Sequence, residues 1–126
     1  NCSYAALPFM TGRAGAMIVN VSSVGGRFGF PGWAVYCATK YAVVGFTEAL
    51  RKEVGSLGIR VVLVEPGMVH SEFGKSGAEK SAAQKQDSND RLQPDDIAEN
   101  IAHVFALPAH VLVQEIIVRP VIQLMP

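Results

Sequence analysis

Three residues that can take part in proton transfer stand close together in the sequence, with Tyr36 and Lys40 four positions apart and Ser23 thirteen positions before the tyrosine. At the start of a helix, Tyr36 and Lys40 would share one face, so the ammonium could lie near the phenol. A free phenol has a pKa of about 10, so a tyrosine acting at neutral pH needs a nearby positive charge to stabilise its phenolate. Ser23 could polarise a substrate oxygen, whereas Ser22 would point the other way along a strand. Together these residues predict proton transfer at a carbonyl or hydroxyl oxygen.

The elements that must position these residues follow from the hydrophobic pattern. Residues 16–22 and 59–65 are apolar runs of strand length, which favours parallel strands buried on both faces. Between them, residues 34–56 repeat apolar positions close to the helical period, and Gly55 or Gly58 can end that helix. Strand, helix and strand in this order predict a right-handed crossover in a parallel sheet. A Tyr-x-x-x-Lys pair alone is usually an exposed helix pair, but this order would bring it to the carboxyl edge of the sheet.

The second half of the chain is more polar. Residues 74–93 offer few anchors for a core and are expected to form a mobile lid over a substrate, with Arg91 as its candidate anion-binding arginine. A helix is predicted from Pro94 to about residue 107, followed by a last strand at 114–118. Pro120 places that strand near an edge.

Composition excludes several classes of function. The 126 residues are 49% hydrophobic and 17% charged, which predicts a globular chain of one domain at most. Eleven basic and eleven acidic residues balance, so nucleic acid and membrane surfaces are not expected partners, and no apolar run is long enough to span a bilayer. Two cysteines without metal-ligand spacing predict no metal site and a reducing compartment, the cytoplasm.

A resemblance to the short-chain dehydrogenase/reductase family is carried by VNVSSVGGRFGFPGWAVYCATKYAVVGFTEALRKEV followed by GIRVVLVEPGMVHSEF, and is close over residues 1–73. The resemblance implies that Tyr36 is the general acid/base and that Ser23 holds the substrate carbonyl or hydroxyl. It also implies that Lys40 assists the phenol and bonds the nicotinamide ribose. The implied reaction is hydride transfer between an alcohol or carbonyl compound and a nicotinamide cofactor.

The same resemblance assigns a cofactor loop to the segment PGMVHS at residues 66–71. Pro66 and Gly67 open it, the backbone of Val69 would hold the nicotinamide carboxamide, and Ser71 stands where the family usually has threonine. Taken alone, Pro66-Gly67 would be an ordinary turn. With Tyr36 and Lys40, these residues form the expected binding site for NADP or NAD, with NADP favoured.

The fold implied by the resemblance is α/β, a Rossmann-type doubly wound parallel sheet in three α/β/α layers. Residues 1–126 would be a single partial domain, the C-terminal catalytic half, because the family's TGxxxGxG turn and NNAG strand end are absent from the sequence. The N-terminal nucleotide-binding half is therefore expected to be missing. The glycine-containing stretch at 11–15 should be a connecting turn, since a phosphate loop must follow a strand and open a helix.

The ending LQPDDIAENIAHVFALPAHVLVQEIIVRP resembles the branch with serine 3-dehydrogenase and related NADP-dependent hydroxy-acid dehydrogenases, which indicates small 3-hydroxy acids as substrates. The family also implies a homodimer or homotetramer packed through the helix that carries Tyr36. The alternative is a truncated, non-catalytic module that uses the same surface to pair with another chain; a partial gene model is a third reading. Intact Ser23, Tyr36 and Lys40 favour the enzyme, and the missing half favours the module.

Overall fold

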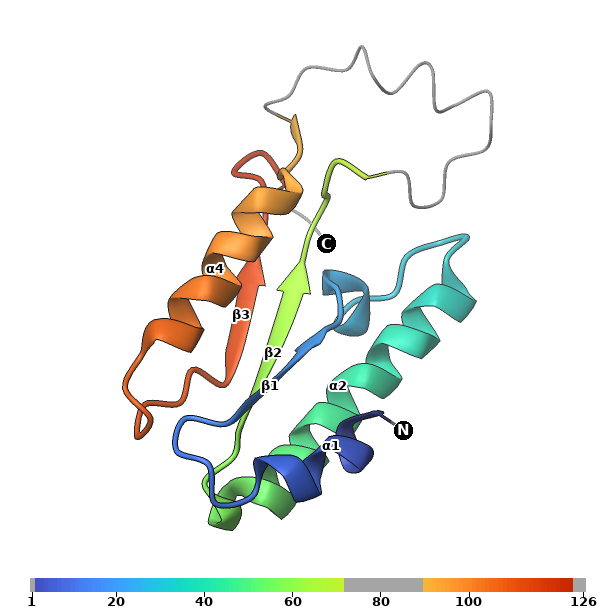
Figure 1. The fold of residues 1–126 in the computed structure, drawn as a ribbon. Coiled ribbons are helices and arrows are strands. Elements are labelled where there is room, and N and C mark those ends of the chain that lie inside the picture. Colours follow the sequence, from blue (N-terminus) through green and yellow to red (C-terminus); the bar gives the residue numbers. More distant parts are fainter. Residues whose placement is uncertain (1, 72–89, 124–126) are drawn as a thin grey trace.

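The computed structural model describes residues 2–71 and 90–123. Helices pack on both faces of one parallel sheet (Figure 1). The sheet has the order β1-β2-β3, with strands β1 (Met17–Val21), β2 (Arg60–Pro66) and β3 (Glu115–Val118). One face is covered by α1 (Cys2–Met10) and α2 (Ala34–Val54), and the other by α4 (Pro94–Ala106) (Figure 1). The predicted three-layer α/β class is confirmed, and the carboxyl ends of all three strands lie at one edge.

The central strand β2 is buried along its whole length. Val62 and Val64 belong to the apolar cluster beneath α4, whereas Val61 belongs to the cluster beneath α1 and α2. A strand that contributes to two cores needs apolar side chains on successive positions, which explains its lack of alternation. The prediction of a strand buried on both faces is therefore correct for β2.

Strand β1 is less covered than its sequence predicts. Only Met17 is buried, and Val21 at its carboxyl end is 46% exposed. Strand β1 pairs with β2 along one edge, and within residues 2–71 and 90–123 no strand pairs with its other edge. The expectation that both faces of this strand are buried is wrong for the described part of the chain, because apolar residues alone do not say which neighbours are present.

Helix α2 is the longest element and crosses from the carboxyl end of β1 back to the start of β2 (Figure 1). A short 3-10 turn, η2 (Gly55–Leu57), continues it, and Gly58 then adopts a left-handed φ of 73°. Glycine reaches this conformation without a Cβ penalty, so Gly58 ends the predicted helix. Among the described helices, none is both long and apolar enough to cross a bilayer.

Helix α4 begins where the sequence predicts. Pro94 occupies its first turn, and the Asp96 carboxylate accepts a 2.7 Å hydrogen bond from the backbone N–H of Gln93 in a capping box. Acidic residues in a first turn also complement the helix dipole. These local signals explain why this boundary could be read from sequence.

The loop after β2 is joined to the start of the next described segment. Val69 and Leu92 form an isolated parallel bridge, with hydrogen bonds from His70 N–H to Leu92 O (2.7 Å) and from Leu92 N–H to Met68 O (2.9 Å). Most of the predicted lid at 74–93 lies outside the described residues. The stretch at 11–15 connects α1 to β1, as predicted.

The short 3-10 turn η1 (Val24–Gly26) packs closely against α2, and Gly26 permits that approach. A Cβ at Gly26 would lie 2.9 Å from Val44 Cγ2 and 3.0 Å from the backbone oxygen of Lys40. We expect Gly26→Ala to lower the free energy of unfolding by about 1–3 kcal/mol through overpacking, measured by urea denaturation. The control is Gly45→Ala in α2, where a Cβ meets nothing within 4 Å and should stabilise by roughly 0.5–1 kcal/mol. Equal stability of the two variants would contradict this close packing.

Candidate active site

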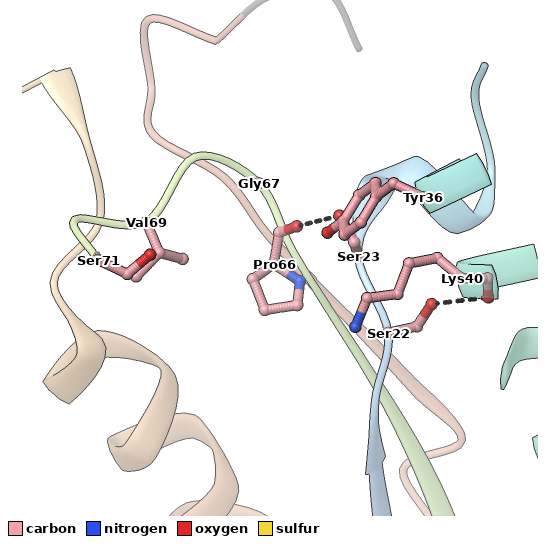
Figure 2. A pocket seen from close by; sticks show the side chains of 8 residues that line it. All are labelled: Ser22, Ser23, Tyr36, Lys40, Pro66, Gly67, Val69 and Ser71. Carbon is pink, nitrogen blue, oxygen red and sulfur yellow. Dashed lines mark hydrogen bonds between the residues drawn. The ribbon is translucent and has the colours of Figure 1, made fainter. Parts of the chain in front are cut away.

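A pocket opens at the carboxyl edge of the sheet, between the ends of β1 and β2 and the first turns of α2 (Figure 2). It encloses about 230 Å³. Every residue that the sequence assigned to catalysis or cofactor binding lies in its lining, which also includes Ser22. The lining residues are Ser22, Ser23, Tyr36, Lys40, Pro66, Gly67, Val69 and Ser71.

Ser23 is the second residue after β1 and is 8% exposed. Its Oγ accepts a 3.1 Å hydrogen bond from the N–H of Gly25, which caps η1, and donates to the carbonyl of Pro66 at 3.4 Å. The second bond is near the long limit of hydrogen bonding and is therefore weak. The Ser23 hydroxyl can therefore leave the Pro66 carbonyl for another acceptor at small energetic cost.

Ser22 also lines the pocket, but its hydroxyl points in a different direction from that of Ser23, in agreement with the sequence-based prediction. Strand β1 ends at Val21, and the Ser22 N–H still donates a 2.8 Å hydrogen bond to Val64 O of β2. Its Oγ donates a 3.0 Å hydrogen bond to the backbone carbonyl of Lys40 (Figure 2). The Ser22 hydroxyl is thus used to hold α2, whereas that of Ser23 faces the end of β2.

Tyr36 and Lys40 extend from successive turns of α2 toward the strand ends (Figure 2). Lys40 Nζ lies 5.8 Å from the centroid of the Tyr36 ring and donates a 3.3 Å hydrogen bond to the carbonyl of Val21. Both residues are half-buried, so their electrostatic interaction is screened less than in water. An ammonium has three N–H donors, and Val21 takes one of them.

The Tyr36 ring is held by two neighbours that the sequence did not single out. Trp33 packs edge-on against it, with 5.5 Å between ring centroids and an interplanar angle of 77°. On Gly25, a Cβ would come within 2.9 Å of Tyr36 Cε1, so only glycine leaves the ring its present position. The close contact of Gly25 with the tyrosine ring becomes visible only in the three-dimensional structure.

The loop after β2 forms the opposite wall, where Val69 and Ser71 lie across from Tyr36 (Figure 2). Its path is fixed by hydrogen bonds from Gly67 N–H to Val118 O (2.7 Å) and from Met68 N–H to Gln123 Oε1 (3.0 Å). Gln123 is 55 positions from Met68, and no local signal in the sequence links them. In the described part of the chain, no three His, Cys, Asp or Glu side chains gather as a metal site requires.

Comparison with known proteins identifies similar sequences that share this region. Residues 1–82 match the family profile described as short chain dehydrogenase. Sulfoacetaldehyde reductase 2 of Chromohalobacter salexigens is 41% identical over 126 residues, which covers 95% of this chain and 49% of that protein. The NADP-dependent 3-hydroxy acid dehydrogenase of Schizosaccharomyces pombe is 36% identical over 119 residues, covering 92% and 46%.

A solved structure shows the same arrangement in space. The closed form of serine dehydrogenase complexed with NADP⁺ superposes with a TM-score of 0.78 at 32% identity, covering 92% of this chain and 48% of that one. The chain spans about half the length of the curated relatives it matches.

Proposed function

Because the chain belongs to the short-chain dehydrogenase family, we propose that its pocket serves the NAD(P)-dependent interconversion of an alcohol and a carbonyl compound by hydride transfer. Its three layers are part of the Rossmann-type fold of that family. One observation carries the proposal: Ser23, Tyr36 and Lys40 line the same pocket as the loop that begins at Pro66. In doubly wound α/β sheets, ligands bind at this carboxyl edge.

The proposed proton donor for carbonyl reduction is Tyr36. Its hydroxyl gives a proton to the carbonyl oxygen as that oxygen gains negative charge, and in the reverse direction the phenolate takes the proton back. The Lys40 ammonium beside the ring stabilises the phenolate. Ser23 donates its hydroxyl hydrogen bond to the same substrate oxygen and so fixes the carbonyl carbon in place. A bound dihydronicotinamide supplies the hydride.

We propose NADP or NAD as the cofactor, with NADP favoured because one relative is named NADP-dependent and a structural neighbour is complexed with NADP⁺. The cavity of about 230 Å³ is smaller than the roughly 300–1,000 Å³ of pockets for whole small-molecule ligands, and fits one ring with the reacting group. Lys40 has N–H donors left for a ribose. Val69 and Ser71, which line the same pocket as Pro66 and Gly67, are the residues proposed to hold the carboxamide.

The proposed substrates are small 3-hydroxy acids. Three similar proteins carry names that point to small acidic compounds: a 3-hydroxy acid dehydrogenase, a serine dehydrogenase and a sulfoacetaldehyde reductase. Arg91 is the candidate to bind the acid group, because it precedes Leu92, whose backbone pairs with Val69 of the pocket wall.

The experiment is a fluorescence titration of NADPH and NADH, on this chain and on the complete protein that contains it, followed by turnover assays. Serine, 3-hydroxyisobutyrate and simple ketones are compared with bulky hydrophobic alcohols. We expect cofactor binding and preferential turnover of the small acids. Activity on bulky alcohols alone would contradict the substrate class. Absence of cofactor binding in both proteins would contradict the oxidoreductase itself.

A non-catalytic module that pairs with another chain is the second candidate. It is favoured by the edge of β1, which has no partner strand in the described part of the chain and ends at the exposed Val21. A folded protein that binds no nicotinamide cofactor but associates with a second chain would support this alternative.

For the enzyme, we propose a homodimer or homotetramer packed through α2. Its surface exposes Val35 (80%) and Tyr41 (47%), which are costly to leave in water. Light scattering of the complete protein measures the oligomer, and a monomer at micromolar concentration would contradict this assembly.

A further inference from the structure

We propose that Arg27 and Glu65 form a positioning pair that holds Ser23 in register with the end of β2. This inference rests on the function proposed above, in which the Ser23 hydroxyl orients the substrate oxygen. Neither Arg27 nor Glu65 lines the pocket, so both would act through Ser23. Arg27 comes directly after η1, and Glu65 directly before Pro66, whose carbonyl accepts the Ser23 hydrogen bond.

Glu65 is a fully buried acidic residue in the middle strand of the sheet, with a relative exposure of 0%. The Arg27 Nε–H group donates to both of its carboxylate oxygens, at 2.9 and 3.2 Å. A buried carboxylate without a partner is strongly unfavourable, so Arg27 must stay at this place as long as β2 is formed. The charge pair therefore fixes where the turn after Ser23 ends.

Two further contacts hold Arg27. Its Nη2 pairs with the carboxylate of Glu115 on β3, and its backbone carbonyl accepts a hydrogen bond from the Tyr41 hydroxyl of α2. Arg27 thus joins the turn after β1 to both other strands and to the helix that carries Tyr36. A planar guanidinium can serve two carboxylates at once, which a lysine ammonium does less well.

The turn between Ser23 and Arg27 is short and internally bonded. Gly26 N–H donates to Ser23 O at 2.8 Å, and Arg27 N–H donates to Val24 O at 2.9 Å. Because the turn is short and hydrogen-bonded, a displacement of Arg27 at its end also displaces Ser23 at its start. The Arg27–Glu65 and Ser23–Pro66 contacts both connect this turn to the end of β2. The ionic contact of Arg27 with Glu65 is the stronger of the two, so it fixes the geometry of the weak hydrogen bond from Ser23 to Pro66.

The test uses Arg27→Met and Arg27→Lys in the complete protein. We expect Arg27→Met to lower kcat by about tenfold or more, with the KM for NADPH changed less than about twofold, because displaced reacting groups cost rate rather than cofactor binding. Arg27→Lys keeps the charge and should recover part of kcat. If Arg27→Met does not fold, Arg27→Lys is the deciding variant. Its kcat should be lower than that of the parent protein but still measurable.

Arg51→Met is the matched control. Arg51 also connects α2 to the sheet, through Nε–H to Val61 O (2.9 Å) and Nη2–H to Gln114 O (2.7 Å), but at the opposite end of β2. Its loss should lower stability and leave kcat unchanged. Equal effects of Arg27→Met and Arg51→Met on kcat would overturn the proposal, because the pair would then be a structural contact like any other.

Amide hydrogen exchange separates this proposal from the proposed function. We expect the Gly25 amide, which donates to Ser23 Oγ, to exchange about tenfold faster in Arg27→Met than in Arg51→Met, relative to amides in the middle of α2. Equal exchange at Gly25 in the two variants would overturn the positioning role. A parent protein without turnover would contradict the proposed reaction, and the exchange comparison would still decide whether Arg27 holds the turn.

Discussion

Tyr36→Phe should lower kcat for carbonyl reduction by about 10²–10⁴-fold, the range typical of losing a general acid, while the Kd for NADPH stays within about twofold. Phenylalanine keeps the ring that packs between Trp33 and Gly25, so the pocket should retain its shape. What it lacks is the phenolic hydroxyl and its proton. Steady-state kinetics with a parallel fluorescence titration measures both quantities.

The control for this substitution is Tyr4→Phe. Tyr4 donates a 2.7 Å hydrogen bond to Glu53, which joins α1 to α2 far from the pocket, and this bond raises the pKa of its phenol. Tyr4→Phe therefore removes a hydrogen-bonded phenolic oxygen, as Tyr36→Phe removes a phenolic oxygen, but it does so outside the pocket. The kcat of Tyr4→Phe should be unchanged. Turnover of Tyr36→Phe within threefold of the parent would mean that another group supplies the proton.

Arg60→Met should destabilise the protein by roughly 3 kcal/mol, through the loss of buried hydrogen bonds. Arg60 is 7% exposed at the amino end of β2. Its Nη1 lies 3.3–3.4 Å from three carbonyl oxygens at and beyond the end of α4, those of Val104, Leu107 and Val111. Its Nη2 donates a 3.1 Å hydrogen bond to Gly15 O. A cation there also complements the negative end of the helix dipole.

Two effects oppose each other at Arg60, and the substitution weighs them. Methionine keeps the apolar stem but leaves those carbonyls without the guanidinium, whereas removing Arg60 also relieves its Nε, which is buried and has no partner among the described residues. Chemical denaturation measures the balance, with the exposed Arg13→Met expected within about 0.5 kcal/mol of the parent. A loss below about 1 kcal/mol at Arg60 would show that burying the guanidinium offsets its hydrogen bonds.

The elements that could be predicted from the sequence are those specified by neighbouring residues. The run Val61-Val62-Leu63-Val64 defines a doubly buried strand, and Pro94 with Asp96 marks the start of α4. Gly58, with its left-handed φ, ends the 3-10 turn that continues the long helix. In each case a periodic pattern or a capping residue carries the information within a few positions.

What could not be predicted depends on contacts between distant segments. The coverage of β1 depends on which strands lie beside it, and its apolar residues are compatible with either one neighbour or two. The same holds for Gln123, which binds Met68 across 55 positions, and for the pairing of Arg27 with Glu65.

The packing of Trp33 on Tyr36 gives the protein a built-in optical probe. Trp33 is the only tryptophan in the 126 residues, so all indole emission of this chain originates 5.5 Å from the ring assigned to proton transfer. A reduced nicotinamide absorbs light in the range where tryptophan emits, so binding beside Tyr36 should quench this emission by energy transfer. Occupancy of the site could then be followed in real time without labels, and a signal change confined to the reduced cofactor would distinguish energy transfer from a change in packing.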